Sequence, residues 1–493
     1  MTKQPIGLLL DMISLDREAA TPLYRQLDAQ LRAAVLSGRL AAGARLPATR
    51  QLAFELGLSR LTVQNTYEQL VAEGFLKSVA GSGTFVEEIA PEDLPPKRPI
   101  PVRPTAAPDI GLSRRGQAIS RTKASTRVAE TRAFRPAVPA PELFPMAPWS
   151  KLWAKALQTL GPDLFGYGRL GGYPPLRAAI AEHLRNARGV RCDPEQVIVT
   201  AGSQQSFALS ALALLDPGDL AWGEDPGHAA GRDILTALGI SVAPVPIDEE
   251  GLSVADGRSR VGTPRLIFVT PSHQHPLGVT MSLRRRLELL QFAQQSGAWI
   301  LEDDYDSEFR YSGRPLPALQ GLDDGERVIY AGSFSKVLYP SLRMGYLVVP
   351  HGLVEPFCAA QTVLSQGIPT LPQVVLAEFM REGRFAAHIR RMRVAYGERQ
   401  KLLVAALEKH AADLLEVEPT DAGMHLMAWL PDWIDDMAAS QALWAAGVEA
   451  IPLSIYCVRP YPRNGLLLGF TSVPPDQIEP NVSKLVMTLA LLQ

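Results

Sequence analysis

The sequence has few cysteines and no long apolar run. Its three cysteines, Cys192, Cys358 and Cys457, stand at wide and unrelated spacings, so they indicate neither a disulfide framework nor a zinc site. No apolar run is long enough to span a bilayer, and the N-terminus lacks the apolar core of a signal peptide. We therefore expect a cytoplasmic protein in a reducing compartment, with no membrane partner and no bound metal.

The chain also lacks a strong charge of either sign. Its formal net charge is −2 over 493 residues, so any binding of nucleic acid has to come from a local basic patch. Apolar residues make up 46% of the chain and charged residues 20%, which is ordinary for a globular protein. A chain of this length is too long for one core, so we expect two or three domains.

Residues 19–87 show the pattern of a winged helix-turn-helix. Apolar residues at helical spacing predict three helices, the last from Arg60 to Glu73 with Ser59 as its N-cap. Two short strands then flank the glycines of 81–83, forming a hairpin. Polar side chains face outward at the start of the third helix, where DNA contacts arise in this motif. The alternative is a small interaction domain that binds no nucleic acid.

Residues 88–138 are rich first in proline and then in serine, arginine and lysine. No apolar periodicity persists, so we expect a flexible linker without a packed core of its own. Its basic excess would suit DNA phosphates, although a solvated linker is the simpler interpretation.

Residues 139–493 alternate short apolar runs with helical stretches. The runs are apolar throughout, as in parallel strands that are buried on both faces; they begin at Gln196, Leu220, Ser241, Leu266, Ala298, Val328 and Met344. We expect a large α/β part at about 160–385 and a smaller α+β part at about 386–493. Ligands of such sheets bind at the carboxyl ends of the strands.

Reactive side chains follow these strands. One strand leads into Ser333-Phe334-Ser335-Lys336, with Arg343 shortly after, and another ends in Glu302-Asp303-Asp304-Tyr305. A lysine for a Schiff base, a carboxylate for a pyridinium nitrogen and hydroxyls for a phosphate are what pyridoxal phosphate requires. The turn Gly202-Ser203-Gln204 precedes a helix, where backbone N–H groups favour a phosphate. Each motif alone fits a solvated loop, but together they predict a cofactor site.

Both halves resemble known families. The segments Leu46-Pro-Ala-Thr-Arg50, Ser59-Arg60 and Gly81-Ser-Gly-Thr resemble the winged-helix domain of GntR-type transcription factors. The segments Tyr167 to Arg177, Pro271 to Gly278, Glu302 to Phe309 and Ser333 to Lys336 resemble fold-type I aminotransferases. The combination resembles the MocR subfamily of GntR-type transcriptional regulators, in which the two domains are fused.

The resemblance implies roles for individual residues. Lys336 would form the internal aldimine, Asp303 would pair with the ring nitrogen, and Tyr305 would pair with the phenolic oxygen. The residues implied around the phosphate are Gly202, Ser203, Gln204, Ser333, Ser335 and Arg343. Tyr167 matches a tyrosine that reaches the phosphate from the partner subunit, which implies a homodimer. Contacts to a double-stranded DNA operator are implied for Arg50, Ser59, Arg60, Thr62, Gln64 and Gly81.

This sequence departs from the family pattern at two histidines. His228 stands where relatives often place the aromatic ring that stacks on the cofactor, and His275 replaces the usual asparagine that bonds the ring oxygen. We assign an acid/base role to neither. An arginine of the small part normally holds the substrate carboxylate, and we favour Arg463 over Arg459 for an effector.

We expect a transcriptional regulator that senses pyridoxal phosphate, or an amine or amino-acid effector, through an aldimine. Such sensing would alter operator binding or promoter activation, with at most a half-transamination. One alternative is a functional aminotransferase with a DNA-binding extension, which the histidine departures disfavour. Another is a direct sensor of vitamin B6.

Overall fold

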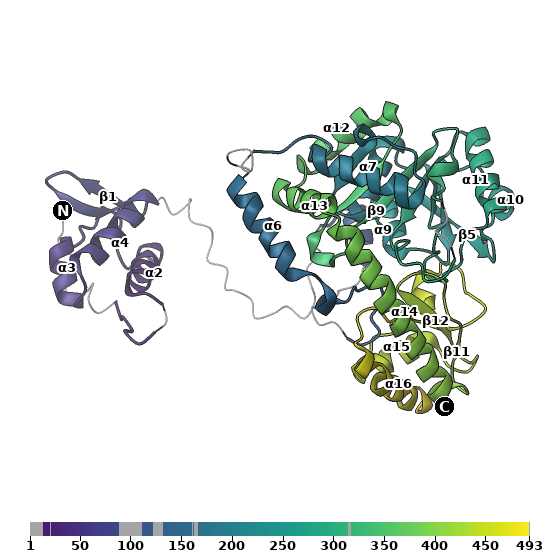
Figure 1. Cartoon of the computed structure of the whole chain (residues 1–493). Coiled ribbons are helices and arrows are strands. Elements are labelled where there is room, and N and C mark those ends of the chain that lie inside the picture. The colour runs from purple at the N-terminus through teal and green to yellow at the C-terminus, as the bar shows by residue number, and fades with distance from the viewer. Residues whose placement is uncertain are drawn as a thin grey trace. The chain divides into compact units, whose positions relative to one another are not determined.

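The computed structural model describes residues 13–19, 21–87, 111–121, 132–159, 161, 166–313 and 317–492. The chain divides into two compact units, Met1–Ile110 and Gly111–Gln493, which Figure 1 shows and which are described separately below. Within the described ranges, no helix combines the length and the apolarity that crossing a membrane would require.

The first unit is a winged helix-turn-helix. It contains α2 (Leu23–Leu36), α3 (Thr49–Leu56), α4 (Arg60–Ala72) and the antiparallel strands β1 (Leu76–Val79) and β2 (Gly83–Val86). The three expected helices and the hairpin are therefore confirmed. Leu27 and Leu31 of α2 and Val63, Tyr67 and Leu70 of α4 are buried in one core, which explains the apolar stripes in the sequence.

The second unit is built on an eight-stranded sheet with the order β3-β10-β9-β8-β7-β4-β5-β6. Strands β5, β4, β7, β8 and β9 are parallel neighbours, whereas β10 runs antiparallel to both β9 and β3. The strands are β3 (Val197–Thr200), β4 (Leu220–Asp225), β5 (Ser241–Asp248), β6 (Gly251–Leu252), β7 (Leu266–Val269), β8 (Trp299–Asp304), β9 (Val328–Ser333) and β10 (Gly345–Val348). The expected, largely parallel sheet is confirmed.

Both faces of this sheet are buried, as the continuous apolar runs predict. Ile267 and Ile300 pack into one apolar cluster, and their chain neighbours Phe268 and Leu301 pack into another. The alternation follows from the period of two residues along a strand. The helices that cover the sheet include α7 (Pro174–Arg188), α8 (Ser203–Leu214), α9 (Ala229–Ala237), α10 (Val254–Arg260), α11 (Leu283–Ser296), α12 (Val354–Ser365) and α13 (Thr370–Arg381).

The smaller α+β part follows the long helix α14 (Arg384–Ala411). Its four strands have the order β11-β12-β14-β13, and it ends in the helix α16 (Pro475–Ala490). The other elements are β11 (Glu416–Val417), β12 (His425–Trp429), α15 (Asp436–Ala445), β13 (Ile451–Pro452) and β14 (Gly465–Gly469). Figure 1 shows this part at the C-terminal end of the chain.

Part of the expected linker is counted with the second unit, which begins at Gly111. A short helix, α5 (Arg114–Arg121), packs against α9, and residues 132–140 run beside the small part. The linker residues 88–110 and 122–131 lie outside the described residues. Helix α6 (Met146–Thr159) then leads into the sheet.

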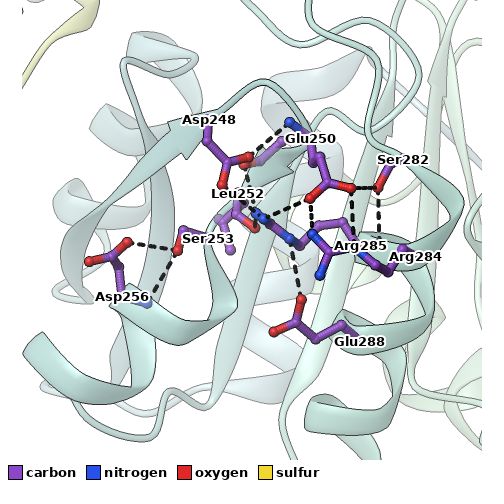
Figure 2. A network of polar contacts seen from close by, with 10 residues as sticks. Asp248, Glu250, Leu252, Ser253, Asp256, Ser282, Arg284, Arg285 and Glu288 are labelled. Atoms are coloured by element: carbon purple, nitrogen blue, oxygen red, sulfur yellow. Dashed lines mark hydrogen bonds and ion pairs between the residues drawn. The ribbon is translucent and has the colours of Figure 1, made fainter.

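A charged network fastens the β5–β6 edge of the sheet to α11 (Figure 2). The Arg285 guanidinium, on a residue that is 6% exposed, donates to the carbonyls of Gly251 and Leu252 and pairs with Asp248 at 2.8 Å. Glu250 accepts from the hydroxyl of Ser282, the N-cap of α11, at 2.9 Å. Each carboxylate here has a cationic or hydroxyl partner, so the network serves the fold.

Candidate functional site

The predicted site residues meet at the carboxyl ends of the parallel strands. Asp303 on β8 lies opposite Ala331 on β9, and Lys336 follows the end of β9. The expectation that the acidic strand end and the lysine turn belong to neighbouring strands is therefore confirmed. This edge is where α/β sheets bind their ligands.

Asp303 is a buried carboxylate at this edge. Its side chain makes no hydrogen bond or ion pair within the described residues, although the residue is only 4% exposed. Burial, together with the charges of Asp304 and Asp306, raises the pKa of Asp303 to about 8, while the nearby Lys336 lowers it. A cationic group placed beside this carboxylate would restore its charged form.

Asp304, by contrast, is paired behind the site. Arg188, at the end of α7, donates to Asp304 at 2.9 Å and to the Ser272 hydroxyl at 2.7 Å. The Tyr330 hydroxyl donates to the same Asp304 oxygen at 2.6 Å. This buried cluster fixes the end of β8, so that Asp303 and Tyr305 are held in place.

Tyr305 belongs to a hydrogen-bonded chain that the sequence reasoning missed. Its hydroxyl lies 3.0 Å from Nδ1 of His273, and the same nitrogen lies 3.1 Å from the Asp306 carboxylate. Burial raises the pKa of Tyr305 well above its usual value, so the hydroxyl keeps its proton. His273 was visible inside the motif Pro271 to Gly278, but nothing in the pattern separated it from His275.

Four of the chain's eight histidines gather in this region. The ring of His275 lies 5.6 Å from that of His228, 5.4 Å from that of His425 and 5.7 Å from that of Tyr305, between centroids. Burial and the neighbouring cations hold the pKa of His275 well below its usual value, and burial lowers that of His425 to about 3. The buried rings of His275 and His425 are therefore neutral, and the described residues contain no metal-binding cluster.

The predicted phosphate residues lie together at the start of α8, in a group that we call the anion cradle. Gly202 is the N-cap of α8 with φ of 102°, and no described side chain caps that helix end. A side chain at Gly202 would meet the Arg343 guanidinium at 3.7 Å, so the two lie across a narrow space. Within the described residues that guanidinium makes no hydrogen bond or ion pair. Helix N–H groups and a guanidinium are the donors that phosphate prefers.

The remaining cradle residues lie on the turns around Arg343 and α8. Ser333 and Ser335 are buried, and the Ser333 hydroxyl accepts from the backbone N–H of Ser335 at 3.2 Å. The Gln204 side chain donates to the carbonyl of Ala230 on α9 at 3.3 Å. Thus the Gln204 side chain already forms a hydrogen bond within the protein, whereas the Ser203 side chain has no partner in the described part.

The structure gives Lys336 a partner that the sequence did not suggest. Its Nζ donates to the carbonyl oxygen of Ala137 at 3.3 Å, across 199 positions of the chain. Ala137 lies in the segment that joins α5 to α6. No local pattern could have identified this contact, because it is made by a backbone carbonyl.

The candidate effector arginines both pair with carboxylates. Arg463 binds Glu416 at 2.6 Å and lies over the Trp429 ring at 4.6 Å. Arg459 binds Asp225 at 3.1 Å and donates to the Pro244 carbonyl. Arg459 is thus tied to the end of β4, close to His228, while Arg463 lies on the small part. Their roles stay predictions.

Tyr167 and the predicted DNA-contact residues are accessible. Tyr167 is 85% exposed, as a residue that reaches into a partner subunit would be. Arg50, Ser59, Arg60, Gln64 and Gly81 are exposed and Thr62 is half-buried. The Ser59 hydroxyl caps α4 by accepting from the N–H of Thr62 at 3.0 Å, so part of its function is structural.

The residues present fit pyridoxal phosphate. For the phosphate, the described part of the chain supplies an uncapped helix start and a guanidinium with no other partner there. For a protonated ring nitrogen it supplies a buried carboxyl. Lys336 can supply the amine, and Tyr305 can donate to the ring oxygen. The donor set matches the cofactor's groups one by one, with His275 standing where relatives carry an amide.

Comparison with known proteins agrees with this arrangement. Residues 23–86 match the family "Bacterial regulatory proteins, gntR family", and residues 147–471 match "Aminotransferase class I and II". The chain is similar to the probable rhizopine catabolism regulatory protein MocR of Rhizobium meliloti, at 42% identity over 96% of this chain and 95% of that protein. It is 33% identical to the HTH-type transcriptional regulator TauR of Rhodobacter capsulatus over 95% and 96% of the two chains.

A solved structure shares the aminotransferase fold. LysN, the α-aminoadipate aminotransferase of Thermus thermophilus, complexed with N-(5'-phosphopyridoxyl)-L-leucine, superposes with a TM-score of 0.70 at 28% identity. The match covers 76% of this chain and 97% of that one.

These findings define the chain as a transcriptional regulator that joins a GntR helix-turn-helix domain to an aminotransferase domain of class I and II. It belongs to the MocR group of GntR-type regulators. The helix-turn-helix domain implies DNA binding, and the aminotransferase fold implies binding of pyridoxal phosphate.

Proposed function

We propose that this regulator binds pyridoxal phosphate at Lys336 and uses it to detect a primary amine or amino acid, which changes binding to its operator. Bound there, the cofactor would supply an aldehyde that forms Schiff bases with amines. The proposal is carried by one observation, the convergence of Lys336, Asp303 and Tyr305 with the anion cradle on one end of the sheet.

The chain's own residues would hold the cofactor at three points. Gly202, Ser203 and Arg343 would bind the phosphate, assisted by Ser333 and Ser335. Asp303 would ionise when it meets the protonated ring nitrogen, because a nearby cation favours the charged carboxylate. Tyr305 would donate to the ring oxygen, oriented by His273 and Asp306.

We also propose a homodimer in which Tyr167 completes the phosphate site of the partner subunit. Its high exposure supports this, since a large aromatic side chain is seldom left so open. The two helix-turn-helix units of such a dimer would bind two half-sites of an operator. The contacts would come from Arg50, Arg60, Thr62, Gln64 and Gly81, with Ser59 positioning the helix.

Several features favour detection over turnover. The ring of His275 is neutral and stands in place of the amide that aminotransferases direct at the ring oxygen. Both candidate arginines of the small part already pair with acids, Arg459 with Asp225 and Arg463 with Glu416. A substrate carboxylate would have to displace these acids. A single half-transamination remains compatible with the proposal.

Absorbance spectroscopy and a turnover assay test the proposal together. Adding pyridoxal phosphate to the full chain should produce the visible band of a Schiff base, and adding primary amines or amino acids should shift it. An assay with amino donors and keto acids should show no repeated turnover. Sustained turnover at ordinary enzyme rates, about 1 to 1000 per second, would instead favour an aminotransferase.

The same samples separate an amine detector from a direct sensor of vitamin B6. A cofactor that stays bound through dialysis supports detection of an amine. A cofactor that leaves readily, with DNA affinity following its concentration, supports sensing of the cofactor itself.

A further inference from the structure

Residues 132–140, which include the end of the linker, lie along the small part and contact Lys336 of the site at Ala137. We call these residues the strap. The carbonyl of Ala133 accepts from the N–H of Glu449 at 2.9 Å, and that of Phe134 accepts from the N–H of Gly469 at 2.8 Å. Further on, the Thr471 hydroxyl donates to the Val138 carbonyl at 2.5 Å. The strap is therefore held by backbone and side-chain bonds on both sides of Ala137.

The strap packs closely as well as forming hydrogen bonds. Phe134 is fully buried, and the Arg132 guanidinium lies 3.7 Å from the centre of the Trp444 ring. A side chain at Gly469 would come within 2.2 Å of the Arg135 carbonyl oxygen. Only a glycine on β14 allows the strap to approach this closely.

The strap's backbone is in an uncommon conformation. Phe134 has φ of 65° and Ala137 has φ of 60°, the left-handed region that non-glycine residues rarely adopt. Such conformations persist where surrounding contacts hold them, and they cluster at ligand clamps and switches. At Ala137 one of the holding contacts is the hydrogen bond from Lys336 Nζ at 3.3 Å.

That hydrogen bond depends on the chemical state of Lys336. An unmodified lysine ammonium has three N–H donors. When its nitrogen condenses with an aldehyde, one water leaves, a C=N bond forms, and at most one N–H remains. When an effector amine takes over that bond, its two hydrogens pass to the lysine nitrogen and the lysine amine is restored without net gain or loss of water.

We propose that the strap responds to this change. The hydrogen bond to Ala137 holds the strap in place when Lys336 carries its amine, and the strap loosens when Lys336 carries the cofactor. A cognate amine would restore the hydrogen bond between Lys336 and Ala137. This inference rests on the proposed attachment of pyridoxal phosphate to Lys336. It identifies the hydrogen bond to Ala137 as the contact through which a change at Lys336 reaches the linker. The linker contacts the large part a second time, because α5 packs against α9.

Hydrogen–deuterium exchange of the full chain tests the proposal. Cofactor addition should speed exchange at Glu449 and Gly469 about tenfold, the loss expected for one hydrogen bond to a charged group. Hydroxylamine, a general amine that takes the cofactor from lysine, should restore slow exchange. Borohydride treatment before hydroxylamine should make strap exchange insensitive to hydroxylamine, because it reduces C=N to a single bond that fixes the cofactor on Lys336.

The visible band separates failure of this inference from failure of the proposed function. A band that forms without any change in strap exchange would overturn the strap proposal and leave cofactor binding intact. If no band forms, the attachment at Lys336 is wrong, and the strap proposal fails with it.

A matched pair of variants tests the strap itself. Gly469→Ala places a methyl group against the Arg135 carbonyl, so the strap should exchange fast with or without cofactor while the visible band still forms. Gly465→Ala lies on the same strand, and its nearest contacts are the side chains of Met427, at 2.9 Å, and Trp429, which are not part of the strap, so its strap should respond to cofactor as the parent does.

Thr471→Val covers the case in which Gly469→Ala fails to fold. It keeps the shape of the buried side chain but removes the donor to Val138, so strap exchange before cofactor addition should rise. Equal responses in this variant and in the parent would contradict the proposal.

Discussion

Two polar networks of the same unit use their charges in opposite ways. In the network of Figure 2, Asp248, Glu250 and Glu288 each pair with an arginine, and Arg285 also binds two carbonyls. At the ends of β8 and β9, neither Asp303 nor Arg343 has a pairing partner within the described residues. Paired charges hold the sheet edge to α11, whereas the groups without partners lie where we propose that a ligand binds.

The two networks differ in how their charged groups are paired, not in the types of residue that they contain. A buried charge costs free energy unless it is paired, so a buried acid without a partner favours its neutral form. The raised pKa of Asp303 records that cost. A cationic ring nitrogen and an anionic phosphate would supply the two missing partners.

The largest expected effect is that of Lys336→Ala. The visible band should be lost completely, because no other amine of the described site can replace the lysine, while DNA binding without cofactor persists. Arg285→Met, which disrupts the network of Figure 2, should lower stability and keep the band. Absorbance spectra of the two variants with added cofactor make the comparison, and a band in Lys336→Ala would refute the lysine assignment.

Asp303→Asn should weaken cofactor binding by about 10- to 100-fold, the range for a hydrogen bond to a charged group. The amide cannot carry the negative charge that favours a protonated ring nitrogen. A fluorescence titration with pyridoxal phosphate measures the affinity. Unchanged affinity would mean that the ring lies elsewhere.

Arg343→Gln should weaken cofactor binding by about tenfold, less than Asp303→Asn, because this arginine is exposed to solvent. Arg284→Gln is the matched control, since Arg284 is an exposed arginine that pairs with Glu250 in the other network. Phosphate-competition titrations of both variants test the cradle. Equal losses in the two variants would contradict it.

Stability should depend on pH through the buried acids at the end of β8. The pKa values of Asp303 and Glu302 are raised to about 8 and about 7 in the folded state, so the folded chain binds more protons than the unfolded chain. Stability of the cofactor-free protein should therefore fall as the pH rises from about 4, near the unfolded-state pKa values, to about 8, by up to about 1.4 kcal/mol per pH unit for each group, and level off near pH 9. Thermal unfolding at about pH 6.5 and 9 measures the fall.

Bound cofactor should reduce this pH dependence, because a cationic ring nitrogen allows Asp303 to ionise in the folded state. Asp303→Asn should reduce it in the cofactor-free protein. If cofactor leaves the fall unchanged, the pairing of Asp303 with the ring is wrong.

The smallest expected effect belongs to the compensated network. Ser253 caps α10 by accepting from the N–H of Asp256 at 3.2 Å, so Ser253→Ala should cost about 1 kcal/mol of unfolding free energy. Cofactor affinity should not change. Denaturant unfolding and a cofactor titration measure both quantities, and a large loss of affinity would remove the distinction between the two networks.

Local pattern was enough to predict much of this molecule. The apolar stripes of α2 and α4 predicted the helix-turn-helix, and continuous apolar runs predicted a sheet buried on both faces. Strand order placed Asp303 beside the lysine turn because neighbouring parallel strands end at one edge. These features depend on residues that are close together in the chain.

What the sequence could not predict depends on contacts between distant residues. The bond from Lys336 to the Ala137 carbonyl has no side-chain signature, and the packing of α5 on α9 lies within a stretch read as linker. His425 joins His273 and His275 only after β12 has folded against the large part. The apolar run from Met344 predicted the strand β10, but nothing in it indicates the antiparallel direction that brings Arg343 opposite Gly202.

The central claim is that the state of Lys336 controls DNA binding. It is tested most directly by measuring, in the same samples, operator affinity and the visible band while the cofactor-loaded full chain is titrated with primary amines and amino acids. We predict that affinity changes in proportion to the shift of the band, and that Lys336→Ala shows neither change. An affinity that stays constant while the band shifts would contradict the account.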